Sequence, residues 1–500
     1  MGQIIMRGIK HLLITVLFGV SIFSCNKSEI IEGNDAYNVD DIKTPAGLRA
    51  ENGGIAFLPD GRMVTCFHLG EVLIYDPKTE EWSVFAKGLH DPLGVYPISE
   101  FEMLVMHRPE LTRLVDTDKD GKADLYQTVT DQFGISGNYH EYNYGPQPDG
   151  KGDFFISLND ASNGAGIWKE VRGEFRAEGR PGRMYSCVPY RGWVMKVDAE
   201  NGDLIPWASG FRSPNGIAVD KSGRLFITDN QGDWLGTSKL YHVEKGKFYG
   251  HPSSLVWEKG FEGIDPLTIP VPVLDKMRQK GSVLFPHSIL ANSPTQPVFD
   301  YTGGEFGPFE GQMIIGEMDH DFLLRVILDE VDGEIQGACV PFVSNQGLTK
   351  GNNRIAWSPD GSLFVGKSDR GWVGGKGMQK ISWNGKTPMD IYEMKLTKSG
   401  FDISFTLPIN PESANDPYSY TIKRYYYKYH RKYGSKQFDV SEVKVKNVML
   451  KEDGKGISID LEDLKPNYIY ELTLPEDIKS KKNTPINNKT IYYTLNKLKS

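Results

Sequence analysis

The sequence predicts an all-β protein in which a six-bladed β-propeller is followed by a small C-terminal β-sandwich of the immunoglobulin or fibronectin type. The first observation is a recurring pattern: residues 53–64, 213–229 and 353–365 each contain an apolar strand, a tight Asp-Gly or Ser-Gly turn and a second apolar strand. Such turns supply the positive φ that a hairpin needs. The second observation is that weaker copies start near Gly94, Glu141 and Gln312. Hairpins repeated about every 40 residues are typical of four-stranded blades, and we predict a propeller over residues 48–387.

The third observation is a change of pattern after residue 387. The glycine-punctuated repeat stops there, and short alternating runs follow at residues 402–407, 442–446 and 468–474. Roughly a hundred residues of such strands suit a small β-sandwich, which we assign to residues 388–500.

Residues 423–433 interleave tyrosines with lysines and arginines. Such a run can offer a surface on which sugars or nucleotides stack. An edge strand whose long side chains cover one face of a sheet explains the same pattern, and we favour this structural reading.

The chain begins with features of a secretory signal peptide, which we assign to residues 1–24. Arg7 and Lys10 precede the apolar run 12–20. That run is too short for a stop-transfer helix and has the length of a signal-peptide core. We therefore expect export.

Residues 22–25, Ile-Phe-Ser-Cys, resemble a bacterial lipobox, so we expect Cys25 to be diacylated and to become the mature N-terminus. Asn26 rather than an acidic residue follows the cysteine, which favours the outer membrane, on its periplasmic or cell-surface side. Residues 25–47 would then form the lipid anchor and a polar tether to the propeller.

The net charge of −8 comes from an acidic propeller and a mildly basic C-terminal part. A phosphate-binding face needs clustered positive charge, so nucleic acid is not an expected partner. Cys66, Cys187 and Cys339 read as small buried hydrophobic side chains. No Cys-x-x-Cys-His motif is present, which excludes covalent c-type haem.

An acidic loop carries the sharpest chemical motif by spacing. Its residues match the first nine positions of an EF-hand loop, in which alternate carboxylates and one backbone carbonyl converge on Ca²⁺ around a glycine bend. The twelfth position is Gln127 rather than glutamate, and no helical pattern flanks the loop. We predict a structural calcium site, with a metal-free acidic hairpin as the alternative. The ligands would be Asp116, Asp118, Asp120, Lys122 and Asp124.

Six segments distributed over the predicted propeller carry a resemblance to a known family: residues 108–113, 137–142, 210–216, 228–234, 246–252 and 302–309. The chain resembles the soluble quinoprotein glucose and sorbosone dehydrogenase superfamily. It is most similar to secreted bacterial propellers labelled sorbosone-dehydrogenase-like or haem-binding. The resemblance implies oxidation of a sugar or polyol, with the electrons passed to an external acceptor such as a cytochrome.

In that superfamily, pyrroloquinoline quinone lies over the propeller mouth, Ca²⁺ holds it, a histidine takes the proton of the sugar hydroxyl and an arginine polarises the quinone. The resemblance carries the base onto His140 and the arginine onto Arg212. The loop expected to read Glu-His-Gly-Pro-Arg-Gly-Gly-Asp-Glu is here residues 229–234, Asp-Asn-Gln-Gly-Asp-Trp, which departs from the pattern. Around the two catalytic residues we expect ten substrate- or cofactor-binding residues: Arg108, Asn215, Asp229, Asn230, Gln231, His251, His320, Asn353, Arg354 and Arg370.

Two other functions remain open at this stage. Asn215 and Asn353 begin inner strands and could hold a divalent ion in the central tunnel, as in the similar Ca²⁺-dependent sugar lactonases, with Glu51 as an approximate match for their glutamate. The chain could instead be a non-catalytic glycan-binding module. In that case the stacking residues would be Trp234, Trp257 and Trp372.

Overall fold

The computed structural model describes residues 30–500 except 164–170, 181 and 371–372. The predicted signal peptide and Cys25 therefore lie outside the described residues, as does Trp372. Within the described part, no helix is long and apolar enough to cross a membrane.

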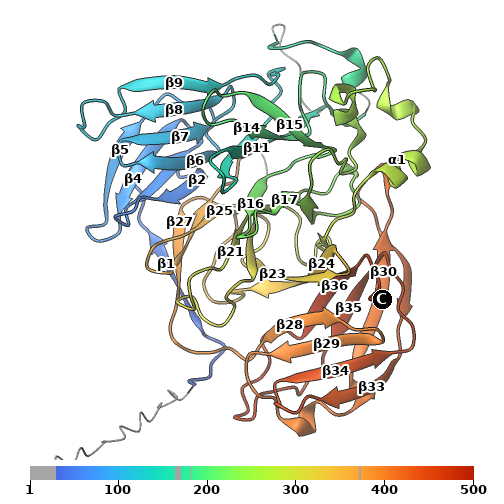
Figure 1. Cartoon of the computed structure of the whole chain (residues 1–500). Coiled ribbons are helices and arrows are strands. Elements are labelled where there is room, and N and C mark those ends of the chain that lie inside the picture. The colour runs from blue at the N-terminus through green and yellow to red at the C-terminus, as the bar shows by residue number, and fades with distance from the viewer. Residues whose placement is uncertain (1–29, 164–170, 181, 371–372) are drawn as a thin grey trace, which may run out of the picture.

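Six antiparallel four-stranded sheets form the propeller in the described residues (Figure 1). The first three are β2 (Asn52–Phe57), β3 (Met63–Phe67), β4 (Glu71–Asp76) and β5 (Glu81–Ala86); β6 (Gly94–Ser99), β7 (Glu102–Met106), β8 (Leu111–Val115) and β9 (Leu125–Thr130); and β10 (Asn143–Pro148), β11 (Phe154–Leu158), β14 (Trp193–Val197) and β15 (Leu204–Ser209). The other three are β16 (Gly216–Val219), β17 (Leu225–Asp229), β19 (Lys239–Val243) and β20 (Val283–Leu284); β21 (Pro294–Phe299), β22 (Met313–Glu317), β23 (Leu323–Val331) and β24 (Glu334–Phe342); and β25 (Asn352–Trp357), β26 (Leu363–Lys367), β27 (Met378–Trp383) and β1 (Tyr37–Ile42).

The innermost strand of each blade contacts the innermost strands of its two neighbours, in the order β2, β6, β10, β16, β21, β25 and back to β2. The ring is therefore closed. This confirms the predicted all-β fold and the six-bladed propeller.

The hairpin turns follow the chemistry that the sequence predicts. Gly61, Gly223 and Gly361 have φ of +94°, +81° and +79°, which side chains with a Cβ rarely adopt. In the first hairpin the Asp60 carboxylate accepts the backbone N–H of Arg62 and fixes the turn.

Strand β1 closes the ring by pairing antiparallel with β27, from Tyr37 opposite Trp383 to Ile42 opposite Met378. The Tyr37 ring is buried against Phe306 and Phe342, with centroids 5.0 Å apart in each pair. Residues 37–42, expected in the tether, thus belong to the last blade, because the outer edge of β27 gains a hydrogen-bonded partner there.

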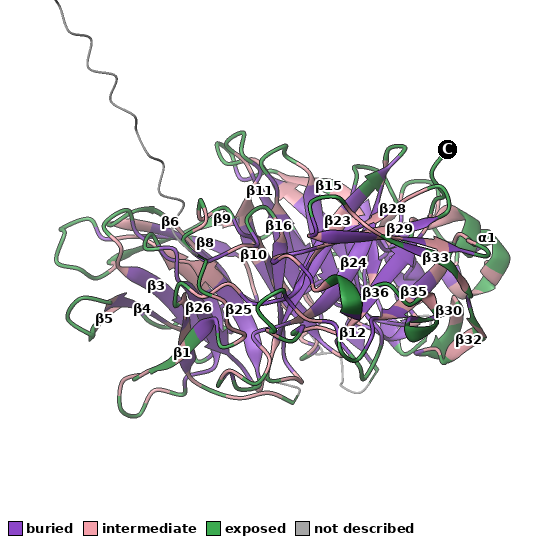
Figure 2. Ribbon diagram, turned by 90° about the horizontal axis from the view of Figure 1, so that it is seen from below, coloured by how far each residue is buried: buried purple, intermediate pink, exposed green. Residues whose placement is uncertain are grey.

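The C-terminal strands form two layers over one core. The first layer is β28 (Ile391–Leu396), β29 (Gly400–Phe405), β34 (Gly456–Leu461) and β33 (Val445–Leu450). The second is β36 (Thr490–Leu495), β35 (Tyr468–Thr473), β30 (Thr421–Tyr427) and β32 (Gln437–Glu442). The second layer is not separate from the propeller, because β36 pairs with β24 and extends the fifth blade to eight strands. Buried residues accordingly continue from β23 and β24 into β35 and β36 (Figure 2).

The tyrosine-rich run differs from the expected edge strand. Its first part, β30, lies between β35 and β32, so Arg424 and Tyr425 are buried. Its second part, β31 (His430–Tyr433), pairs with β18 (Asp233–Trp234) of the fourth blade. The C-terminal part therefore reaches across to the propeller and covers Trp234, which is 3% exposed.

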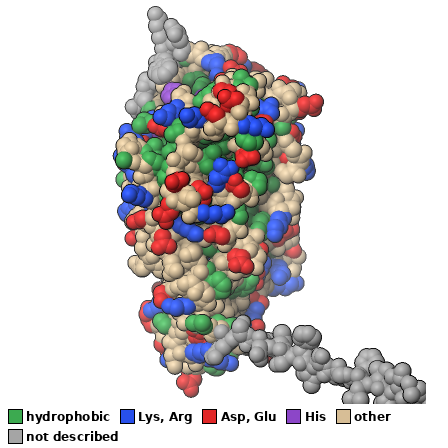
Figure 3. Space-filling model, turned by 90° about the vertical axis from the view of Figure 1, so that its left-hand side faces the viewer, with side chains coloured by type: hydrophobic (Ala, Val, Ile, Leu, Met, Phe, Trp, Pro, Cys, Tyr) green, Lys and Arg blue, Asp and Glu red, His purple; other side chains and the backbone are tan. Residues whose placement is uncertain are grey.

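Shorter elements complete the described chain. They are the strand pair β12 (Ala161–Ser162) and β13 (Met184–Tyr185), the short helix α1 (Val271–Met277), and the 3-10 turns η1 (Ala177–Gly179), η2 (Pro252–Trp257), η3 (Pro266–Thr268), η4 (Pro411–Ser413) and η5 (Pro417–Ser419). Cys66, Cys187 and Cys339 are free and buried, as predicted. On the face that Figure 3 shows, basic and acidic side chains are interspersed over the blades.

Candidate functional site

A cavity of about 150 Å³ lies where innermost strands begin and second strands end, which in antiparallel blades is one face of the propeller. Six of the predicted site residues line it: His140, Arg212, Asn215, Asn230, Gln231 and Arg370. They lie on four loops of three blades, since the loops before β10 and β16 and those after β17 and β26 meet at this mouth of the central tunnel.

His140 has the geometry of a general base. Its Nδ1–H donates to the backbone oxygen of Asp160 at 2.9 Å, because a carbonyl can only accept. Its Nε2 has no hydrogen-bond partner among the described residues and the ring lines the cavity. Burial, together with the neighbouring Arg212 charge, lowers the pKa of His140 to about 4, so the imidazole is neutral at pH 7.

Arg212 is held beside the same cavity. Its Nε lies 3.7 Å from Asp233 Oδ1, and its guanidinium lies over the Tyr433 ring at 5.6 Å from the centroid. A Cβ at Gly232 would come within 1.9 Å of Arg212 Nε, so only glycine leaves room for the side chain there. Gly232, in the loop 229–234 that differs from the superfamily pattern, therefore leaves the space that the Arg212 side chain occupies.

Asp233 is tied to a histidine that does not line the cavity. His251 lies 2.9 Å from Asp160 Oδ2 through Nδ1 and 3.4 Å from Asp233 Oδ2 through Nε2. Burial alone lowers the pKa of His251, but the carboxylates of Asp233 and Asp160 outweigh it and raise the pKa to about 9. His251 is thus a buried cation between Asp160 and Asp233, and it does not line the cavity where the sequence predicted it to bind substrate.

A second cluster centres on Asp91, which the sequence analysis missed. Its carboxylate lies 2.7 Å from Arg108 Nη2, 2.9 Å from Arg370 Nη2 and 2.8 Å from His68 Nδ1. Burial raises the pKa of Asp91, but the His68 hydrogen bond and the Arg108 charge outweigh it and hold the pKa well below its usual range. Arg370 reaches the cavity, whereas Arg108 covers the Tyr142 ring at 4.9 Å from its centroid and does not line it.

Arg354 lies across the tunnel below the cavity. Its Nη1 donates to Asn215 Oδ1 at 2.7 Å and approaches Asn353 Oδ1 at 3.3 Å, and its Nε donates to Gly53 O at 2.9 Å. A guanidinium therefore occupies the place between the two amide oxygens where the lactonase reading put a divalent ion. Asn353 also donates to Asn52 O and does not line the cavity.

Two further predicted residues serve the backbone. The Asp229 carboxylate accepts the N–H groups of Arg212 and Ser213 at 3.1 and 2.7 Å, so both its oxygens are engaged away from any ligand. The backbone N–H of His320 donates to Glu317, and its ring packs 4.8 Å from Phe322 rather than lining the cavity. Neither side chain lines the cavity, so the structure does not place Asp229 or His320 for the direct binding that we predicted there. Polar side chains at strand ends can also cap the neighbouring loop.

Tyrosines and one arginine line the cavity without having been predicted. Tyr139, Tyr142 and Tyr144 flank His140 along the chain, which is the signal that could have found them. Tyr433 comes from β31, and Arg183 lies over its ring at 4.2 Å from the centroid. Of the tryptophans named for stacking, Trp234 is covered and Trp257 donates to Ser186 O at 3.0 Å, and neither lines this cavity; Trp372 lies outside the described residues.

The predicted calcium loop connects β8 to β9 on the other face of the propeller. Oxygens of Asp116, Asp118 and Asp120 lie within 4.8 Å of one another. Asp124 faces Thr117 instead, accepting its hydroxyl at 2.7 Å. Three converging carboxylates fit a hard cation. The loop lies on the other face of the propeller and shares no residue with the cavity, so the structural calcium site stays a prediction.

The mouth matches pyrroloquinoline quinone in charge but not in size. The guanidinium groups of Arg183, Arg212 and Arg370 suit its carboxylates. Cofactor sites commonly enclose about 300–1,000 Å³, whereas this cavity encloses about 150 Å³ with Tyr433 as one wall. The carboxylate cluster with metal-ligand spacing in the described residues lies on the other face. No chemical step is therefore assigned to that cofactor.

No protein-family model matches the chain, and no curated protein matches it. Among solved structures, the chain is similar to the soluble aldose sugar dehydrogenase of Escherichia coli, with 16% identity, a TM-score of 0.47, and coverage of 70% of this chain and 100% of that one. It is similar to the PQQ-bound aldose sugar dehydrogenase of Streptomyces coelicolor, with 15% identity, a TM-score of 0.46, and coverage of 69% and 98%. It is also similar to the calcium-binding protein regucalcin of Agrobacterium tumefaciens strain C58, with 11% identity, a TM-score of 0.41, and coverage of 69% of this chain and 93% of that one. These similarities concern the fold and assign no role to any residue. That the chain belongs to the sorbosone-dehydrogenase-like, haem-binding subgroup stays a prediction.

Proposed function

We propose that the tunnel mouth binds a sugar or polyol and oxidises one of its hydroxyl groups. The observation that supports this proposal is His140, whose Nδ1–H is held by a carbonyl while Nε2 faces a cavity lined by tyrosines and arginines. Tyrosine rings pack against the apolar faces of sugars, and arginines bond their hydroxyls.

In the proposed reaction, His140 Nε2 takes the hydroxyl proton as the carbon-bound hydrogen leaves as hydride. A soluble two-electron oxidant, such as the dye of the assay below, accepts the hydride, and the substrate becomes a carbonyl compound. Arg212 stabilises the negative charge that develops on oxygen. The negative charge that develops on the substrate oxygen also raises the pKa of the His140 imidazole. This rise offsets the weak basicity that burial imposes on His140.

The test is dye-linked oxidation of a panel of aldoses and polyols, with each rate normalised to the folded fraction. His140→Ala should lower the rate by about 10² to 10⁴, the usual effect of removing a positioned base. His242→Ala is the matched control, because His242 is half-buried on β19 and does not line the cavity. Equal losses in both variants would contradict the proposal.

Lactone hydrolysis assayed on the same samples tests the rival function. With Arg354 between Asn215 and Asn353, we expect no metal-dependent hydrolysis. Sugar binding without turnover in any assay would instead support a binding module.

A further inference from the structure

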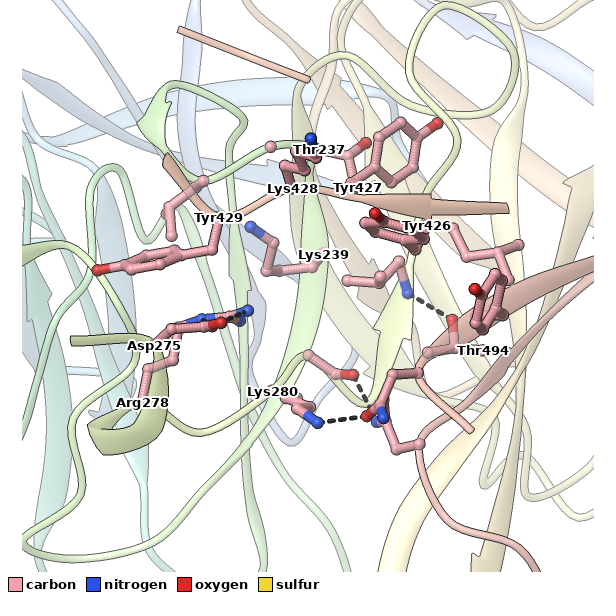
Figure 4. Close-up of a pocket in the computed structure, with 18 of the residues that line it drawn as sticks. Thr237, Lys239, Asp275, Arg278, Lys280, Tyr426, Tyr427, Lys428, Tyr429 and Thr494 are labelled. Carbon is pink, nitrogen blue, oxygen red and sulfur yellow. Dashed lines mark hydrogen bonds and ion pairs between the residues drawn. The ribbon is translucent and has the colours of Figure 1, made fainter. Parts of the chain in front are cut away.

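A second, larger cavity lies in the seam between the fourth blade and the C-terminal layers (Figure 4). Its volume is about 690 Å³, and it shares no lining residue with the tunnel mouth. Its wall is formed by residues from two propeller segments, 234–239 and 275–284, and from three segments of the C-terminal part, 426–429, 467–469 and 494–496. A cavity of this size at a seam between two parts of a chain is typical of a small-molecule site.

Lys239 points into this cavity from the start of β19 (Figure 4). The residue is 5% exposed, and its ammonium lies over the Tyr241 ring at 5.8 Å from the centroid, with no hydrogen-bond or ion-pair partner among the described residues. A buried ammonium without a partner is costly, so an anion that entered the cavity would form a desolvated, charge-assisted pair with it. Burial, assisted by Arg278 and Arg212 and opposed by Asp229, lowers the pKa of Lys239 to about 7.

The remaining charges on the wall are mostly engaged. Arg278 donates to Asp275 at 2.7 Å and lies over the Tyr429 ring at 4.6 Å from the centroid. Lys280 donates to Asn467 Oδ1. With Lys276 and Lys428 also in the wall, the cavity concentrates positive charge within a protein whose net charge is −8. Such a field attracts anions. Lys276 and Lys428 are exposed to water, so Lys239 is the buried ammonium of the wall that could pair with an anion.

Tyrosine rings provide the apolar part of the wall. Tyr426 and Tyr468 meet edge to face, with centroids 5.5 Å apart. The hydroxyl of Tyr468 donates to Asp439 and that of Tyr429 donates to Gly250 O, both at 2.6 Å, so these rings are fixed in place. Fixed rings beside the Asn467 and Asn496 amides suit a ring-shaped polar ligand such as a pyranose.

The wall is poorly suited to phosphate. Helix α1 meets the cavity with its last turn, at Asp275 and Lys276, and so presents the carbonyl end rather than free backbone N–H groups. The Arg278 guanidinium, which could grip phosphate, is already bonded to Asp275. The one buried lysine that the described residues contribute to this wall, Lys239, matches one carboxylate.

We propose that this cavity binds a sugar acid, with Lys239 pairing its carboxylate and the tyrosines packing on its ring. The site is independent of the proposed oxidation at the tunnel mouth. The ligand could be a free sugar acid or the end of an acidic polysaccharide, which share this chemistry.

Titration calorimetry of the whole protein with D-glucuronate tests the proposal. Glucuronate should bind at least tenfold more tightly than glucose, acetate or inorganic phosphate. Lys239→Met should weaken glucuronate binding at least tenfold while the melting temperature stays the same or rises, because a buried unpaired charge is removed. Tyr426→Leu should weaken it several-fold. Lys221→Met is the matched control and should bind as wild type does, since Lys221 lies over the Tyr301 ring outside the cavity.

Unchanged affinity in Lys239→Met, or phosphate binding more tightly than glucuronate, would overturn the proposal. So would equal affinity at pH 6 and pH 9, because the charged form of Lys239 is lost as pH rises through its pKa. Tighter binding of a trigalacturonate than of the monomer would identify a polysaccharide end. Equal binding of the two would identify a free sugar acid.

Discussion

Arg354→Met tests the idea that one buried guanidinium ties the blades together across the tunnel. The substitution keeps an unbranched side chain and removes hydrogen bonds to Asn215 Oδ1 and Asn353 O, both at 2.7 Å, and to Gly53 O at 2.9 Å. A buried acceptor left without a donor costs about 1–3 kcal/mol.

Two effects make the total cost smaller than the sum over the three acceptors that lose their donor. The cost of burying the guanidinium disappears, and water can enter from the adjoining cavity of about 80 Å³, which Arg354 lines. We therefore expect a loss of about 2–4 kcal/mol in the free energy of unfolding.

The assay is urea unfolding followed by tryptophan fluorescence, in which the midpoint should fall with little change in slope. Arg224→Met is the matched control, because Arg224 is 37% exposed, where its ion pairs with Asp220 and Glu330 contribute at most about 1 kcal/mol. A midpoint that falls no further in Arg354→Met than in the control would refute the reasoning.

Three further predictions concern charge and location. Asp91→Asn should destabilise the protein near pH 7, and because the folded pKa of Asp91 lies below the unfolded one, its advantage over the variant should shrink as pH falls below about 4; parallel melting curves from pH 7 to 2.5 would contradict this. Asp116→Ala with Asp120→Ala should abolish a Ca²⁺-dependent rise in melting temperature, and a wild-type melting curve that calcium leaves unmoved would remove the metal assignment. We also propose that Cys25 carries the lipid, so Cys25→Ser should move the protein from the detergent to the aqueous phase, whereas equal partitioning would exclude the anchor.

The propeller could be predicted from the sequence because each blade repeats its own local turn chemistry. The turns at Gly61 and Gly223 need no distant partner, and the hairpin repeat also shows where inner strands begin. That is why His140 and Asn215 could be placed at the mouth. The pairing of strand β1 could not be predicted in this way, since its partner β27 is more than 300 residues away in the sequence.

The sequence placed polar residues at the tunnel mouth but did not reveal which of their side chains line the cavity. Asp229 and Asn230 are adjacent in sequence, yet one caps backbone N–H groups and the other lines the cavity. Capping and binding use the same polar residue types, so only the contacts distinguish them. Tyr433 reaches the mouth through the pairing of β31 with β18, for which the sequence carries no local signal.

The most direct test of the central claim is the pH dependence of kcat/KM for sugar oxidation, measured while the folded fraction is monitored. His140 must be neutral to accept a proton, and its pKa is lowered to about 4. We therefore predict a kcat/KM that is flat from about pH 5 to 8 and falls below about pH 4. A limb centred near pH 6.5, the value of an unperturbed histidine, would contradict it.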